Sequence, residues 1–227
     1  YADSLFFPWG FPALLALTQS LLGAYAPVAP LIALTCGAMS IPLLYEVTRR
    51  TLGRPTARAA TLLYVCWPAQ LFLTPVVASE HPALLFTLLS LAFLVRAVPP
   101  RAMEGQSGPA RAGSPRAEWL RLLATGAAIA AAGLMRPVLG VLAPVAALYT
   151  WTQTRGMVHS LLVLAFGVAS WAVGQVAFSE WCLRNTGRTP PNVAWWNLLA
   201  GLNDQADGRW NEPDATRYFA ATAPADR

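Results

Sequence analysis

The stretch that decides the fold is VAPLIALTCGAMSIPLLYEVTRR, residues 28–50. Its apolar part is about 20 residues long, which as an α-helix covers about 30 Å, the thickness of a bilayer's hydrocarbon core. The run ends in Arg49-Arg50, and Arg54 and Arg58 follow closely. Short loops on the cytoplasmic side of membrane proteins are rich in arginine and lysine. The stretch therefore predicts a transmembrane helix whose C-terminal end is cytoplasmic.

Further apolar runs of similar length lie on the C-terminal side of this first span. We expect spans at residues 28–48, 59–77, 82–98, 119–134, 137–151 and 158–178. The earlier run, residues 11–25, is too short to cross, so we interpret it as an interfacial helix. Pro68 and Pro75 should bend the second span. The sequence thus predicts an all-α fold, a polytopic transmembrane helix bundle of about six spans plus a short interfacial helix.

Composition supports the membrane assignment. The 227 residues are 56% hydrophobic and 12% charged, whereas a soluble domain has about 25% charged residues. The 16 basic residues are all arginine, which we interpret as the codon bias of a GC-rich genome. The net charge of +5 is explained by arginines in short loops beside apolar runs. We therefore expect the lipid bilayer as a partner and no nucleic acid.

Two parts follow from this division of the chain. Residues 1–178 form the predicted transmembrane domain, and residues 179–227 an extracytoplasmic C-terminal segment. Residues 99–118 are rich in Pro, Gly, Ser and Arg, which predicts a flexible cytoplasmic loop. The small residues between Gly126 and Gly133 should let that span approach its neighbours closely. The chain begins at Tyr1 without a signal peptide, and we interpret it as an N-terminally truncated fragment.

Polar residues gather on the predicted extracytoplasmic side. With alternating spans, this face receives Glu80, His81, Arg136, Arg184, Asn185 and the Trp195-Trp196 pair. Arginine binds phosphate oxygens through two parallel hydrogen bonds. A carboxylate suits a general base or a ligand of a divalent cation, Mg²⁺ or Mn²⁺, the one cofactor that the hypothesis admits. The pattern predicts an amphipathic substrate with a phosphate in its headgroup.

Each of these residues also has a simpler interpretation. Glu80 could cap the helix that follows it, where a negative charge is favourable. His81 could be a solvated interfacial residue, and Arg136 an ordinary loop residue, although an arginine outside runs against the usual charge bias. The tryptophans could be interfacial belt residues. The convergence of these residues on one face, more than any single residue, favours a functional site.

The order of several short motifs resembles one family. The motifs are Phe7-Pro8-Trp9-Gly10-Phe11-Pro12-Ala13-Leu14-Leu15, Tyr45 through Arg50 with Leu52-Gly53-Arg54, Ser79-Glu80-His81-Pro82, Arg136-Pro137, Trp181-Cys182-Leu183-Arg184-Asn185 and Asn197 through Asn203. They are similar to motifs of the GT-C fold glycosyltransferases that use polyprenyl-phosphate sugars. Within that fold they resemble the group of protein O-mannosyltransferases and aminoarabinose transferases.

The resemblance implies transfer of a sugar from a polyprenyl-phosphate donor to an extracytoplasmic acceptor, which is a protein, lipid or glycan. It implies Glu80 as the second outer-loop acid, and Arg136 and Arg184 on the phosphate side. The principal acid of the family lies in the first outer loop, well ahead of the Pro-rich turn. Asp3 is the only acid there in this chain and, with Glu80, a candidate catalytic residue, but it is a poor substitute for the principal acid, which is expected upstream. We expect a bacterial cytoplasmic membrane protein with its site facing outside.

Two other classes of protein fit the composition. A transporter or lipid flippase would also place charges near the membrane, but transporters tend to carry them near the midplane of paired repeats. The sequence has no such repeat. A non-catalytic membrane subunit is the third alternative, and the expected absence of the principal acid from this fragment keeps it open.

Overall fold

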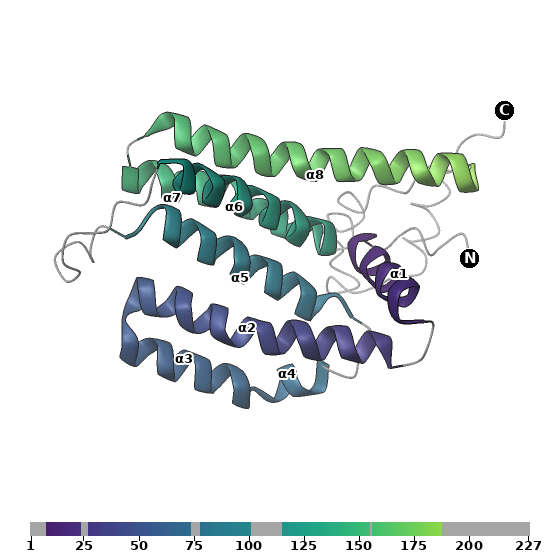
Figure 1. Ribbon diagram of the computed structural model, residues 1–227, viewed down its shortest axis with the longest axis horizontal. Helices are drawn as coiled ribbons and strands as arrows, with labels where there is room; N and C mark the ends of the chain where they lie inside the picture. Colours follow the sequence, from purple (N-terminus) through teal and green to yellow (C-terminus); the bar gives the residue numbers. More distant parts are fainter. Residues whose placement is uncertain (1–7, 24–26, 74–77, 101–114, 155, 188–227) are drawn as a thin grey trace, which may run out of the picture. The chain divides into compact units, whose positions relative to one another are not determined.

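The computed structural model describes residues 8–23, 27–73, 78–100, 115–154 and 156–187. These residues are almost entirely helical and contain no strand, so the predicted all-α bundle is confirmed (Figure 1). The elements in order are α1 Gly10–Leu22, α2 Val28–Leu52, α3 Arg54–Cys66, α4 Pro68–Leu73, α5 Glu80–Ala97, α6 Pro115–Met135, the 3-10 helix η3 Pro137–Val141, α7 Leu142–Thr154 and α8 Met157–Thr186.

The chain divides into two compact units. Pro8–Val176 is one, and Tyr1–Phe7 with Ala177–Arg227 is the other. The described part of the second unit is the end of α8, up to Gly187. Most of the predicted loop 99–118, and the C-terminal segment from residue 188 onward, lie outside the described residues.

Four of the predicted spans are single long helices. Among the described residues, α2, α5, α6 and α8 are long and apolar enough to cross a membrane. The predicted span 59–77 is instead broken into α3 and α4 at Trp67, whose backbone is extended (φ −70°, ψ 114°). The residue before a proline is driven out of the helical conformation, and Pro68 follows. The bend predicted at Pro68 is therefore present, whereas Pro75 lies outside the described residues.

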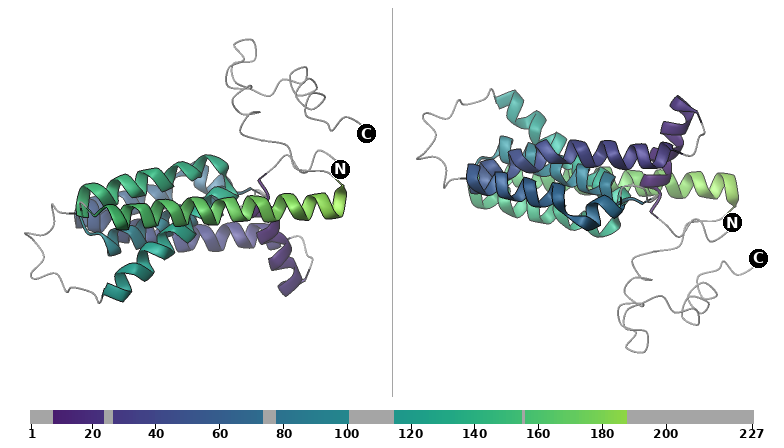
Figure 2. Two further views of the ribbon diagram at one scale, coloured as in Figure 1. Left: turned by 90° about the horizontal axis from the view of Figure 1, so that it is seen from above. Right: turned by 90° about the horizontal axis from the view of Figure 1, so that it is seen from below.

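The predicted span 137–151 is likewise not one regular helix. It opens as the five-residue 3-10 helix η3 before α7 begins at Leu142. The short helix α1 is apolar, as expected for residues 11–25, and lies at a steep angle to the long helices (Figure 2). Such an inclination suits a helix at the membrane interface.

The middle of the larger unit is α5, which packs against α2 on one side and α6 on the other, while α3 covers α2. One buried cluster joins α1, α2, α5 and α6 near the start of α5: Phe11, Val28, Ile32, Cys36, Ala83, Leu85 and Met135. A second cluster joins α5, α6, α7 and α8 near the end of α5: Leu94, Val98, Leu122, Ile129, Ala143, Ala146 and Val163. We call the end of the bundle at the start of α5 the Glu80 end. The opposite end, which holds Arg49, Arg50 and Arg96, is called the arginine-rich end.

The predicted close approach of α6 to a neighbour is present, and the neighbour is α8. A Cβ added to Gly126 would lie 2.8 Å from Cδ1 of Phe166, and one on Gly133 2.9 Å from Cδ1 of Trp171. Only glycine allows the two helices to approach this closely, since small residues are what bring helix backbones together in lipid.

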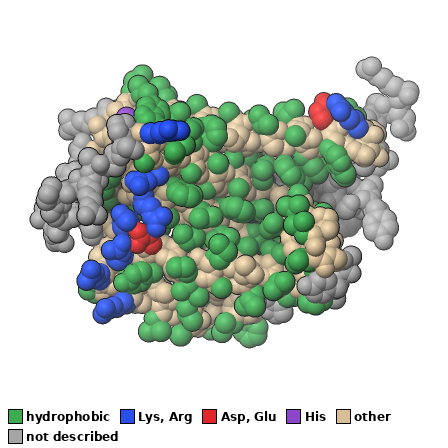
Figure 3. Space-filling view, in the orientation of Figure 1, with side chains coloured by type: hydrophobic (Ala, Val, Ile, Leu, Met, Phe, Trp, Pro, Cys, Tyr) green, Lys and Arg blue, Asp and Glu red, His purple; other side chains and the backbone are tan. Residues whose placement is uncertain are grey.

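Large apolar side chains are exposed along the outer faces of the helices, as they would be toward lipid. Examples are Leu63, Phe72, Leu148 and Val173. Hydrophobic groups cover much of the face shown in Figure 3, and most of the basic groups in this view gather at one end. A soluble protein rarely exposes so large an apolar surface. The protein is an integral membrane protein.

Candidate active site at the Glu80 end

The start of α5 positions Glu80. Ser79 is the residue before the helix, and its carbonyl accepts the first helical hydrogen bond from the Ala83 amide at 2.9 Å. Pro82 is tolerated in this first turn because the amides there have no partner within the helix. Glu80 therefore stands at the N-terminus of a helix, where the helix dipole favours a negative charge.

The end of α6 positions Arg136. Pro137 disfavours a helical conformation for the residue before it, so α6 ends at Met135 and Arg136 is extended (φ −144°, ψ 111°). Pro137 then opens η3, where its missing amide hydrogen costs nothing. Because α6 packs along α5, the end of α6 lies beside the start of α5.

Glu80 and Arg136 form an ion pair between the two helices. The Nη2 group of Arg136 donates to Oε1 of Glu80, and its Nε group donates to Oγ of Ser79 at 3.4 Å. The side chains are 32% exposed for Glu80 and 46% exposed for Arg136. The second oxygen of Glu80, Oε2, is buried and has no hydrogen-bond partner within the described part of the chain. The site thus offers an accessible guanidinium and one uncommitted carboxylate oxygen.

This ion pair goes beyond the simpler interpretations, in which Glu80 only caps its helix and Arg136 is an ordinary loop residue. Ser79 makes no side-chain capping bond, and the Glu80 carboxylate contacts a side chain 56 residues away. Arg136 is likewise held by a second helix. The pair accounts for an arginine at the end of the bundle opposite the arginine-rich end.

The Pro-rich turn near the start of the chain packs next to this pair. A Cβ on Gly10 would lie 2.6 Å from the carbonyl carbon and oxygen of Leu134, two residues before Arg136. Phe11 is buried in the cluster that contains Met135. The start of α1 therefore closes against the end of α6, and residue 10 must be glycine for the two backbones to meet.

His81 does not lie on the surface of the site. It is 2% exposed, and a Cβ on Gly37 of α2 would be 3.1 Å from its Cδ2 atom. Its Nδ1 atom is buried with no partner in the described ranges. The interpretation of His81 as a solvated interfacial residue is wrong, because α2 packs over its ring. Its place behind Glu80 suits support of the site better than contact with a substrate.

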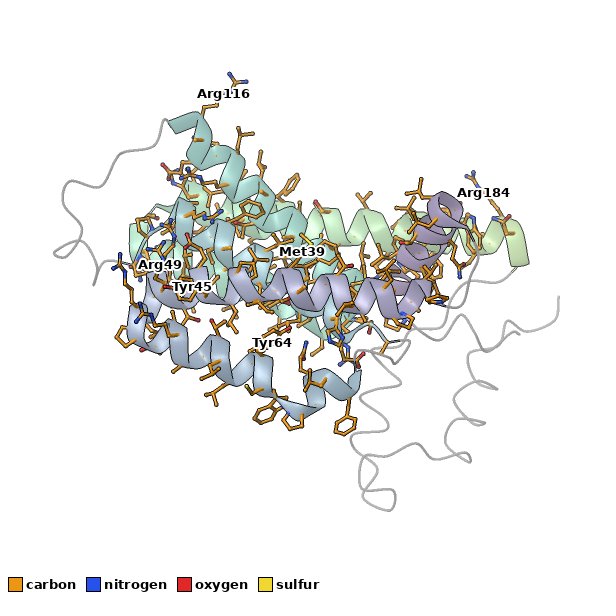
Figure 4. All side chains as sticks on the ribbon, turned by 60° about the horizontal axis from the view of Figure 1, so that its bottom comes forward. Met39, Tyr45, Arg49, Tyr64, Arg116 and Arg184 are labelled. Atoms are coloured by element: carbon orange, nitrogen blue, oxygen red, sulfur yellow. The ribbon has the colours of Figure 1, made fainter. Side chains whose placement is uncertain are left out.

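Two polar residues near His81 were missed at the sequence level. The Nε2 group of Gln70 donates to Oη of Tyr64 at 2.7 Å, and Tyr64 Oη donates to the Gly37 carbonyl at 3.5 Å (Figure 4, which labels Tyr64). These bonds join α4 and α3 to α2. A glutamine inside a predicted span was the available signal, since polar residues within the membrane usually have a role.

The other predicted site residues do not belong to this arrangement as described. Arg184 lies 3.6 Å from Glu180, and Asn185 donates to the Trp181 carbonyl at 2.8 Å. Both stand at the end of α8, in the smaller unit. Asp3 and the Trp195-Trp196 pair lie outside the described residues. Their predicted roles stay predictions.

The expected divalent cation also stays a prediction. In the described ranges no group of three or more His, Cys, Asp or Glu side chains could hold a metal ion. From the described part of the chain, Glu80 could supply one carboxylate oxygen, Oε2, to such a cation.

The family comparison covers most of the chain. The family described as dolichyl-phosphate-mannose-protein mannosyltransferase matches residues 28–183, a range that includes Glu80, His81 and Arg136 but not Asp3, Arg184 or Asn185. Neither the curated proteins nor the solved structures gave a significant match. The family is one of membrane glycosyltransferases that use a polyprenyl-phosphate sugar donor. The motifs, the helical membrane bundle and this match together show that the chain belongs to the dolichyl-phosphate-mannose-protein mannosyltransferase family.

Proposed function

We propose that this protein transfers mannose from a polyprenyl-phosphate donor to a hydroxyl group of a protein at the Glu80 end of the bundle, on the extracytoplasmic side. The observation that carries the proposal is the Glu80–Arg136 ion pair, which joins two membrane-spanning helices within the family-matched range. The donor lipid would lie in the bilayer beside these helices, with its phosphate at their ends.

Arg136 is the phosphate-binding group in this proposal. Its guanidinium is accessible, and a phosphate can accept two parallel hydrogen bonds from it. A phosphate arriving at Arg136 competes with Glu80 for the same donors. Donor binding would therefore replace the resting ion pair and leave the Glu80 carboxylate free to turn toward the acceptor.

Glu80 serves as the second acid of the site. Once it has turned out of the ion pair, its carboxylate can accept a hydrogen bond from the acceptor hydroxyl and orient it toward the anomeric carbon. The principal acid that the family resemblance implies removes the hydroxyl proton as the new carbon–oxygen bond forms. The bond from the anomeric carbon to the phosphate breaks, and the electron pair leaves on the phosphate, where Arg136 stabilises the charge.

The test is transfer of radiolabelled mannose from a polyprenyl-phosphate donor by the protein in proteoliposomes. Glu80→Gln should lower transfer about 10- to 100-fold, and Arg136→Ala at least as much, because each removes one aligned electrostatic contact of the transition state. Arg136→Lys should recover only part of the activity, since an ammonium group cannot bind phosphate through a planar fork.

Glu118→Gln is the matched control. It neutralises a carboxylate of α6 that pairs with His159 at 3.5 Å, away from the Glu80 end, and should leave transfer unchanged. Full activity of both Glu80→Gln and Arg136→Ala would exclude this site assignment. No transfer by the unmodified protein with any polyprenyl-phosphate sugar would favour the non-catalytic subunit instead.

A further inference from the structure

A second polar site lies at the arginine-rich end. The Glu46 carboxylate of α2 is shared by three guanidinium groups: Arg49 at 2.7 Å, Arg50 at 2.5 Å and Arg96 of α5 at 3.4 Å. Arg121 of α6 donates to the Arg96 carbonyl at 3.1 Å. Figure 3 shows acidic side chains surrounded by basic ones at this end of the bundle. We call these four arginines with Glu46 the arginine cluster.

The arginine cluster has more positive charge than Glu46 can balance. Each guanidinium carries five N–H donors, and one carboxylate offers about four acceptor positions. The side chains of Arg49, Arg50 and Arg96 are 35%, 38% and 42% exposed, so donors of all three can reach an incoming anion. The cluster is therefore a ready site for a phosphate group.

An apolar cavity of about 290 Å³ ends beside the arginine cluster. It is lined by side chains of α2, α5, α6 and α7, including Val47, Thr51, Leu94 and Tyr149. On α2, Val47 and Thr51 lie three residues before and one residue after Arg50, and on α5 the lining residue Val95 precedes Arg96. On α2, Val47 and Arg50 are three residues apart and therefore neighbours on the helix surface, so the cavity lies next to the arginine cluster there.

We propose that this end of the bundle binds one anionic glycerophospholipid of the cytoplasmic leaflet, with an acyl chain in the cavity and the phosphate on Arg50 and Arg96. The cavity walls belong largely to membrane-spanning helices, so its occupant lies within the bilayer. Basic pockets between transmembrane helices on the cytoplasmic side suit anionic headgroups. The leaflet follows from the concentration of arginine at this end.

This site is distinct from the one at the Glu80 end. Glu80 and Arg96 stand at opposite ends of α5, and 16 residues of helix separate them by about 24 Å. One headgroup cannot contact both. The bound phospholipid is therefore not the sugar donor, and the proposal does not depend on the proposed glycosyl transfer.

The experiment measures lipids retained by the protein. The protein is reconstituted in vesicles of equal parts phosphatidylglycerol and phosphatidylcholine, extracted in mild detergent, and examined by native mass spectrometry. The unmodified protein should retain one phosphatidylglycerol in preference to phosphatidylcholine. The double variant Arg50→Gln with Arg96→Gln should weaken this retention about 25-fold, at roughly fivefold for each arginine lost near a lipid phosphate.

Two further variants separate a built site from general charge attraction. Arg58→Gln with Arg116→Gln removes the same charge from exposed positions outside the cluster and should leave retention intact. Val145→Trp fills the cavity from α7 and should abolish retention with every arginine present. Thermal unfolding of each variant checks that it is folded.

Equal loss in both double variants would overturn the proposal, since the attraction would then be diffuse. Full retention by a folded Val145→Trp variant would overturn it too, because the cavity would then play no part. Displacement of phosphatidylglycerol by a small excess of polyprenyl phosphate would show a site for the donor lipid and would contradict the assigned occupant.

Discussion

At the scale of single residues, we propose a catalytic role for the Glu80–Arg136 pair and expect the pair to contribute little to the stability of the fold. Both side chains are about one-third exposed or more, and exposed ion pairs contribute about 0–1 kcal/mol to the free energy of unfolding. Its proposed value lies in the placement of the guanidinium and the carboxylate.

We predict that Arg136→Gln lowers the free energy of unfolding by no more than about 1 kcal/mol while it reduces mannose transfer by tenfold or more. Unfolding in mixed micelles and the transfer assay on the same preparation measure the two effects. A large loss of stability with proportionate loss of transfer would instead make the pair a structural contact.

The contact between His81 and Gly37 gives a prediction about packing. In Gly37→Ala the new Cβ would lie 3.1 Å from the imidazole, so the ring must shift, and we expect a loss of about 1–3 kcal/mol of stability. Combination with His81→Ala should recover part of that loss, because the clash is then removed. Gly140→Ala is the matched control, since a Cβ there meets nothing within 4 Å.

Transfer activity distinguishes whether His81 supports the site. If the ring holds the start of α5 in place, Gly37→Ala should lower the rate of transfer more than the affinity for the donor. An unchanged rate in a destabilised Gly37→Ala variant would show that His81 has a packing role alone.

At the scale of elements, α6 and α8 pack through glycines, and the cost of replacing a glycine by alanine depends on which one is replaced. A Cβ on Gly126 would lie 3.1 Å from the Gly167 amide nitrogen and 2.8 Å from Phe166, so the helices must move apart. A Cβ on Gly167 would meet the Ala143 Cβ at 3.4 Å, an ordinary contact.

We predict that Gly126→Ala destabilises the protein by about 1–3 kcal/mol and that Gly167→Ala changes its stability by less than about 1 kcal/mol. Unfolding of the two variants side by side checks the asymmetry. Equal losses would mean that α6 and α8 are not packed as described.

At the scale of the whole molecule, the arginine distribution predicts orientation. Arg49, Arg50 and Arg96 lie at one end of the larger unit and Arg136 at the other. From the positive-inside rule we expect the arginine-rich end to be cytoplasmic. The proposed phospholipid site and the proposed catalytic site would then face opposite sides of the membrane.

Cysteine labelling in intact cells tests this orientation. A cysteine at Ser107 should react only after permeabilisation, and one at Asp207 should react from outside. The background must lack the exposed thiol of Cys66, whereas Cys36 and Cys182 are buried. Reaction of Ser107→Cys from the outside would reverse the orientation and both site assignments.

The sequence by itself determined the class of the fold and the positions of its four long apolar helices. Apolar runs of membrane-spanning length have no other stable form in lipid than the helix, because a backbone amide without a partner is costly there. Pro68 and Pro137 disfavour a helical conformation in the residue before them. The sequence therefore predicted a bend at Pro68 and the end of a span just before Pro137. Motif order carried the family, which the match over residues 28–183 confirms.

Only the tertiary structure decided which residues meet. Glu80 and Arg136 were predicted on one face, but their direct pairing depends on α5 and α6 lying side by side. The burial of His81 beside Gly37 depends on the contact of α2 with α5. The sequence around Glu46 likewise gave no sign that this carboxylate pairs with Arg96 of another helix. Periodicity and loop charge are properties of nearby residues, whereas the distance between remote side chains is fixed by helix packing, which the sequence encodes only through the whole bundle.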